Sequence, residues 1–240
     1  MKAMIFAAGL GTRLRPLTDN LPKALIPVQS RPIFDWVVES LSWFGVNEII
    51  VNTHYLHDQI GAHILEKKFP VSITTSYEPE ILGTGGGLFQ TRDFWNTEHF
   101  LVQNVDILCT ANLNQLLEQH KNNQWLATLA INQAPANSCL LVDEHGLLCG
   151  LDKKGETTLV RPPIGSMRKV NFCGIHAISS EIFSLRHPQV EFSIIDMYLR
   201  LVKEGEKIGT WDIGNAYWID IGTQESLNRA DKEFPGNIRS

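Results

Sequence analysis

The segment from residue 3 to residue 28, AMIFAAGLGTRLRPLTDNLPKALIPV, constrains the fold more than any other part of the sequence. Its first six residues are apolar or small and predict one buried strand, which must end at Gly9 and Gly11, where the backbone can turn without a Cβ penalty. Residues 1–31 carry five basic side chains and one acidic side chain, a local charge of +4 in a chain of net charge −5. This contrast indicates a small anionic ligand, because a nucleic-acid surface needs a broader basic stripe.

The side chains of this loop suit a triphosphate better than a neutral ligand. Thr12 offers a hydroxyl, Arg13 a planar fork of donors and Lys23 a movable point charge. The loop is not a Walker motif, because Gly9 is not followed five residues later by Gly-Lys. It is not a dinucleotide fingerprint either, because Leu14 occupies the place of the third glycine. The alternative is a glycine-rich turn with solvated cations.

Taken together, the elements G-x-G-T-R-L, P-L-T and P-K-x-L-x-P resemble the signature of the sugar-1-phosphate nucleotidylyltransferases, and the similarity continues at intervals to about residue 231. The resemblance implies that Arg13 holds the departing phosphates and that Lys23 neutralises charge during transfer, which makes both residues catalytic. It also implies nucleotide contacts from both glycine clusters and from the end of a later strand, namely Ala7, Ala8, Gly9, Gly11, Thr12, Arg13, Gly83, Thr84, Gly85 and Asn104.

The pattern after the loop predicts an α/β fold. Apolar residues at helical spacing over 33–44 precede a β-branched run at 48–52, and a second amphipathic helix over 56–65 precedes a strand over 71–76. This alternation predicts a Rossmann-like, mostly parallel sheet flanked by helices. The resemblance implies the same architecture, the nucleotide-diphospho-sugar transferase type.

A hairpin interrupts this alternation in the second half of the chain. Apolar runs at 140–142 and 147–151 flank the loop Asp-Glu-His-Gly, which predicts an antiparallel β excursion over the sugar side. The length fits one nucleotidyltransferase domain over residues 1–240. Within it we expect residues 1–110 to bind mainly the nucleotide and residues 111–231 mainly the sugar.

Three features of the sequence indicate where in the cell the protein is located. No stretch approaches the roughly eighteen apolar residues of a membrane helix. Arg13 and Arg15 stand where the cleavage region of a signal peptide should be neutral. The four cysteines form no C-x-x-C pair and suit a reducing compartment. We therefore expect a cytoplasmic monomer or homodimer without nucleic-acid or membrane partners.

The second glycine cluster lies in residues 78–94, EPEILGTGGGLFQTRDF. Thr84 is placed to cap a helix that begins near Gly85. Three consecutive glycines are poor helix formers, so we expect a flat nucleobase to lie against their bare backbone. An ordinary flexible loop is the alternative.

Two aspartates, each at the end of an apolar strand, are the candidate metal ligands. Asp106 ends the strand His99-Phe-Leu-Val-Gln-Asn-Val-Asp, and Asp220 ends Tyr217-Trp-Ile-Asp. A parallel sheet can bring such ends together, and Mg²⁺ takes one or two carboxylates plus phosphate oxygens. Zinc does not fit, because His54 and His57 belong to no H-E-x-x-H motif. The resemblance likewise implies that both aspartates bind Mg²⁺.

The sugar side is less regular. The resemblance implies sugar contacts from Asp106, Asn171 and Gly174. Val105 replaces the small residue of the N-G-D pattern, so either the valine turns into the core or the sugar pocket is narrower. Residues 162–169 are expected to form a mobile loop before a strand over residues 170–178.

These features predict Mg²⁺-dependent transfer of a nucleotidyl group from a nucleoside triphosphate to a sugar 1-phosphate. The A-A-G start and the T-G-G-G cluster look most like N-acetylmuramate-1-phosphate uridylyltransferases, which favours UTP with N-acetylmuramate 1-phosphate. GTP with mannose or heptose 1-phosphate is the alternative, and Ile81, where some relatives carry a uracil-reading glutamine, weakens the first choice. Phosphocholine cytidylyltransferases begin similarly. A non-catalytic nucleotide-sugar-binding regulatory module and, more remotely, a dinucleotide oxidoreductase stay open.

Overall fold

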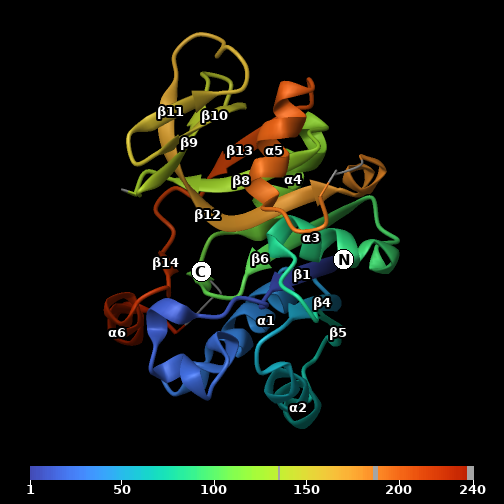
Figure 1. Cartoon of the computed structure of the whole chain (residues 1–240), viewed down its shortest axis with the longest axis vertical. Coiled ribbons are helices and arrows are strands. Elements are labelled where there is room, and N and C mark those ends of the chain that lie inside the picture. The colour runs from blue at the N-terminus through green and yellow to red at the C-terminus, as the bar shows by residue number, and fades with distance from the viewer. Residues whose placement is uncertain (135, 186–188, 237–240) are drawn as a thin grey trace.

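The computed structural model describes residues 1–134, 136–185 and 189–236 (Figure 1). The strands are β1 (Lys2–Phe6), β2 (Pro27–Val28), β3 (Arg31–Pro32), β4 (Glu48–Thr53), β5 (Ser72–Tyr77), β6 (His99–Asn104), β7 (Ile107–Cys109), β8 (Ala127–Asn132), β9 (Ser138–Val142), β10 (Leu148–Lys153), β11 (Glu156–Leu159), β12 (Arg168–Ser179), β13 (Ile208–Asp212) and β14 (Trp218–Asp220). The α-helices are α1 (Ile33–Trp43), α2 (His57–Lys67), α3 (Gly83–Gln90), α4 (Leu113–Asn123), α5 (Ile194–Lys203) and α6 (Gln224–Glu233).

A ten-stranded mixed sheet forms the centre of the molecule, with the main order β11-β10-β9-β12-β6-β1-β4-β5. β1 pairs in parallel with β4 on one side and β6 on the other, and β5 continues in parallel beyond β4. β12 is antiparallel to both β6 and β8, and β13 joins β8 in parallel. The predicted fold, a mostly parallel sheet flanked by helices, is confirmed.

Helices cover both faces of this sheet, so the side chains on both faces of β1 are buried. Ala3 and Ile5 pack into one apolar cluster, to which α1, α2, α4 and α6 contribute, while Met4 and Phe6 pack into a second cluster with α3 and α5. This explains why residues 3–6 of β1 are all apolar, which is typical of a parallel strand that is covered on both faces. No helix among the described residues is long and apolar enough to cross a membrane.

The predicted hairpin is present as β9 and β10, which pair antiparallel and continue to β11. Gly146 lies in its loop with φ of 74°, the backbone conformation that favours glycine at this turn. In Figure 1 this excursion stands at the opposite end of the molecule from α1 and α2.

One local prediction was wrong, and one strand was missed. The loop expected at 162–169 ends earlier, because Arg168 and Lys169 already belong to β12, where they pair with Val142 and Leu141 of β9. Lys169 is also held by Asp152, 2.8 Å from its Nζ atom. Strand β13 was not predicted at all.

Candidate active site

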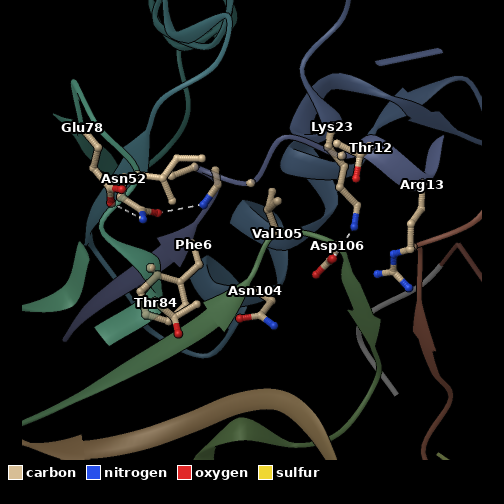
Figure 2. Close-up of a pocket in the computed structure, with 17 residues that line it drawn as sticks. Phe6, Thr12, Arg13, Lys23, Asn52, Glu78, Thr84, Asn104, Val105 and Asp106 are labelled. Carbon is tan, nitrogen blue, oxygen red and sulfur yellow. Dashed lines mark hydrogen bonds and ion pairs between the residues drawn. The ribbon is translucent and has the colours of Figure 1, made fainter. Parts of the chain in front are cut away.

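A cavity of about 320 Å³ opens at the carboxyl ends of β1 and β6. The chain runs from β1 outward to β4 and β5 and then returns to β6 on the other side of β1, so this is the switch point where open α/β sheets bind ligands. The predicted site residues that line it are Ala7, Ala8, Gly9, Gly11, Thr12, Arg13, Lys23, Gly83, Thr84, Asn104 and Asp106. Figure 2 shows how the labelled side chains surround the cavity.

The loop that contains Gly9 and Gly11, called the glycine loop below, makes a tight turn. Gly11 has φ of 64°, and a Cβ at this position would lie 2.8 Å from Cγ2 of Thr18. The Thr18 hydroxyl donates to the Gly11 carbonyl at 2.9 Å, and the Leu14 N–H donates to the same oxygen at 2.9 Å. Only glycine fits this turn, which places Thr12 and Arg13 at the edge of the cavity.

The two aspartates do converge, although not in the way that the sequence suggested. Asp106 follows β6, and Asp220 ends β14, which pairs antiparallel with β7 in a separate two-stranded ladder. The Asp106 carbonyl accepts the N–H of Ile221 at 2.9 Å. The expectation that parallel strands bring these acids together was therefore wrong, because a short antiparallel ladder does so.

Opposite charges gather around this pair of acids. Lys23 Nζ forms an ion pair with Asp106 Oδ2, and both side chains are largely buried. Asp220 Oδ1 is buried and accepts no hydrogen bond from the described residues. Burial raises the pKa of Asp220 and the Asp106 carboxylate raises it further, while Lys23 and Arg13 act in the opposite direction.

This arrangement fits a divalent cation. A buried carboxylate oxygen without a donor, beside a second carboxylate, offers the hard oxygen ligands that Mg²⁺ prefers. No group of three or more His, Cys, Asp or Glu side chains suited to a metal occurs in the described part of the chain, which leaves the remaining coordination positions to substrate oxygens and water.

We expect Asp220→Asn to stabilise the protein in EDTA by about 1 to 3 kcal/mol, because the amide removes an unsatisfied buried charge. The pKa of Asp220 is raised by folding, so its ionisation costs stability as pH rises from the unfolded carboxyl pKa through the folded pKa. The gain in melting temperature should therefore grow over that interval and vanish below it. Thermal melts across pH measure it; an equal gain at every pH, or none, would contradict the expectation.

Added Mg²⁺ provides the control for this variant. If Asp220 is a metal ligand, excess Mg²⁺ should raise the melting temperature of the parent protein more than that of Asp220→Asn, because only a ligand that binds the folded state stabilises it. Equal shifts in both proteins would exclude Asp220 from the metal site.

The glycine cluster of α3 serves packing, which corrects its expected role. A Cβ on Gly85 would lie 2.2 Å from Cε2 of Phe192, and one on Gly86 would lie 2.2 Å from the Val190 carbonyl oxygen. Gly85 does not line the cavity, so the expected bare surface for a nucleobase is filled by protein. Only Gly83 and Thr84 face the cavity.

The sequence suggested that Thr84 caps α3, but it does not. The helix begins at Gly83 with Leu82 at the N-cap, and the Leu82 side chain makes no capping hydrogen bond. The Thr84 hydroxyl instead accepts the N–H of Ile194 at 2.9 Å, which ties α3 to the start of α5.

Of the three residues expected to contact the sugar, Asp106 lines the cavity, whereas Gly174 and Asn171 do not. Gly174 has φ of 72°, and a Cβ there would lie 2.9 Å from Nδ2 of Asn104, so this glycine makes room for Asn104. Asn171 donates to Oδ1 of Asn132 at 3.0 Å. Val105 is buried in the apolar core, and its side chain also borders the cavity.

Several residues that line the cavity were not predicted from the sequence, above all Asn52 and Glu78. Both stand at the carboxyl ends of parallel strands, β4 and β5 respectively. The rule that selected Asp106 could have selected them too. Gly222 and Phe6 were also missed, and Ile81 lies at the rim, 36% exposed.

Residues 2–142 match the sequence profile of the nucleotidyl transferase family. The chain belongs to this family. Among its relatives are the mannose-1-phosphate guanylyltransferase catalytic subunit beta of Xenopus tropicalis, 29% identical over 92% of this chain and 61% of the relative, and the UTP–glucose-1-phosphate uridylyltransferase of Synechocystis, 28% identical over 92% and 60%. This family member thus spans about three fifths of the length of those relatives.

Another relative has the same extent as this chain. The D-glycero-alpha-D-manno-heptose 1-phosphate guanylyltransferase of Aneurinibacillus thermoaerophilus is 27% identical over 98% of both chains. Among solved structures, HddC from Yersinia pseudotuberculosis complexed with GMP-PN superposes with a TM-score of 0.79, at 22% identity over 97% of this chain and 99% of that chain. That likeness establishes the fold of this nucleotidyl transferase family member, and the relatives confirm the resemblance to sugar-1-phosphate nucleotidylyltransferases.

Proposed function

We propose that this protein transfers a nucleotidyl group from a nucleoside triphosphate to a sugar 1-phosphate and releases pyrophosphate. One observation carries the proposal: a glycine loop with Arg13 and Lys23 borders the same cavity as Asp106, beside Asp220. The nucleotide half, residues 1–110, supplies the loops at β1, β4, β5 and β6, and we assign the sugar mainly to residues 111–231.

In the proposed reaction a phosphate oxygen of the sugar 1-phosphate attacks the α-phosphorus of the triphosphate. No general base is required, because the attacking phosphate is already anionic. The barrier is electrostatic, since two anions meet and charge grows on the leaving oxygens. Arg13 and Lys23 supply positive charge at the departing phosphates, and their fixed positions reduce reorganisation during transfer.

Asp106 and Asp220 would hold the Mg²⁺ ion. When bound, such an ion neutralises phosphate charge and orients the triphosphate. Lys23 forms an ion pair with Asp106, so this lysine would hold the proposed metal ligand close to the glycine loop.

Two pairs of substrates compete within this proposal. The guanylyltransferases among the relatives, including the one of equal extent, support GTP with mannose or heptose 1-phosphate. The T-G-G-G cluster, together with a uridylyltransferase relative, supports UTP with N-acetylmuramate 1-phosphate. The location in the cytoplasm and a monomeric or homodimeric state belong to the same proposal.

The test crosses GTP, UTP and CTP with mannose, heptose and N-acetylmuramate 1-phosphates and measures pyrophosphate release with Mg²⁺. We expect one pair to exceed the others by about a hundredfold or more in kcat/KM, since a site built for one base leaves polar groups unpaired with another. Nucleotide-sugar binding without pyrophosphate release from any pair would favour the non-catalytic module. The Asp106→Asn protein serves as the background control.

A further inference from the structure

A chain of hydrogen bonds in the wall of the cavity joins the glycine loop to the start of α3. The Ala7 N–H, in the glycine loop, donates to Oδ1 of Asn52 at 2.8 Å. Asn52 Nδ2 donates to Oε1 of Glu78 at 2.7 Å, and the Leu82 N–H donates to Oε2 of Glu78 at 3.0 Å. Figure 2 shows Asn52 between Glu78 and the glycine loop.

The direction of every bond in this chain is determined by its ends. Both ends are backbone N–H groups, which can only donate. Asn52 must therefore present its oxygen to Ala7 and its amide nitrogen to Glu78. The side chain at 78 then receives a donor on each side, so it must offer two acceptors, and among side chains of its size only a carboxylate does so.

The surroundings show that this carboxylate is built into the structure. Glu78 is 0% exposed and Asn52 is 3% exposed. A Cβ on Gly87 would lie 2.5 Å from Glu78 Oε1 and 2.8 Å from Asn52 Nδ2, so α3 carries a glycine where it passes the pair. The Glu78 N–H also donates to the Thr53 carbonyl at 2.8 Å, which fixes the backbone between β4 and β5.

We infer that Asn52 and Glu78 are positioning residues that set the distance between the glycine loop and the start of α3, and thereby nucleotide affinity. The inference rests on the proposed function and deepens it. Residues of both segments line the cavity, and each segment is anchored to the pair through a backbone N–H. Buried hydrogen-bond networks of this kind act as a unit, so a change at either residue moves both segments.

The decisive experiment exchanges the roles of the two side chains. In Glu78→Gln the new amide Nε2, itself a donor, faces either Asn52 Nδ2 or the Leu82 N–H, so one hydrogen bond is lost. In Asn52→Asp two buried carboxylates face each other. In the double variant N52D/E78Q, Asp accepts from Ala7 and from the new glutamine, whose oxygen accepts from Leu82. Every bond is then restored with the total charge unchanged.

We expect each single substitution to raise the dissociation constants of GTP and UTP by about ten- to a hundredfold, and N52D/E78Q to return them to within about threefold of the parent. KM for the triphosphate should follow the dissociation constant while kcat changes less, as for a residue that acts through binding geometry. Glu80→Gln, which removes a charge at an exposed position two residues away, should leave both unchanged.

The swap also separates positioning from direct contact with the base. If Glu78 acts by presenting its own carboxylate to the nucleotide, N52D/E78Q stays as weak as Glu78→Gln, and the inference is overturned. Additive losses in the double variant overturn it as well. A parent protein that binds neither triphosphate and releases no pyrophosphate overturns the proposed function, and this inference with it.

Gly87→Ala provides a second variant in case the double variant does not fold. Its φ lies outside the left-handed region, so alanine is allowed there and favours the helix, yet its methyl group displaces the pair. We expect a protein that still folds but binds GTP and UTP more weakly than the parent protein does. Unchanged affinity in a folded Gly87→Ala protein would overturn the inference.

Discussion

Asp106→Asn should lower turnover by at least about a hundredfold, or roughly 2.7 kcal/mol of transition-state stabilisation. The substitution removes a carboxylate that faces the cavity, lies beside Asp220 and pairs with Lys23. We expect its loss to weaken the proposed metal site and to release Lys23 from its ion pair. Pyrophosphate release at saturating substrate measures the effect.

The matched control for this variant is Asp93→Asn, which removes the same charge from a side chain that is 98% exposed. Its turnover should equal that of the parent protein. Near-normal turnover in Asp106→Asn would remove the carboxylate from the mechanism, whereas equal losses in both variants would indicate an effect of net charge.

Arg13→Ala should also lower turnover by at least about a hundredfold, because in the proposed reaction its guanidinium lies at the departing phosphates, where charge grows during transfer. The structure ties Arg13 to a second residue. A Cβ on Gly222 would lie 2.6 Å from Nη2 of Arg13 and 2.9 Å from Oδ1 of Asp220. The glycine therefore lets the guanidinium lie close to the carboxylate.

A double-mutant cycle tests this connection. Gly222→Ala alone should lower turnover by about tenfold or more, since its methyl group displaces Arg13. In an Arg13→Ala background the same change should have a smaller effect, and we expect the loss that remains to act through Asp220, whose Oδ1 would lie 2.9 Å from the methyl group. Arg92→Ala, at a side chain that is 69% exposed, is the control. Additive losses from Arg13→Ala and Gly222→Ala would show that the glycine acts independently of the arginine.

Local patterns were enough to predict the glycine loop and the aspartate after β6, which both line the cavity. The run before Gly9, the turn at Gly11 and the acid after β6 each follow from adjacent residues, so the sequence places them without knowledge of distant contacts. The same holds for the hairpin of β9 and β10. These are the parts of the fold in which the determining residues are neighbours.

Two of the missed features, the packing of the α3 glycines and strand β13, depend on contacts between distant residues. The glycines of α3 are explained by Phe192, Val190 and Glu78, none of which lies within the helix. Strand β13 is short and contains Gly209, whose position is set by the ring of Trp125: a Cβ would lie 1.8 Å from its Cε3 atom. No periodicity in the sequence reveals such pairs.

The ladder of β7 and β14 has a consequence for the order in which the protein is synthesised. Asp106 leaves the ribosome more than a hundred residues before Asp220, and the two acids meet only when β14 pairs with β7. A nascent chain that has passed β6 already contains the glycine loop and the strands that support it, but it lacks half of the metal site. Under the proposed function, we therefore expect the nascent chain to gain catalytic activity only after β14 docks on β7.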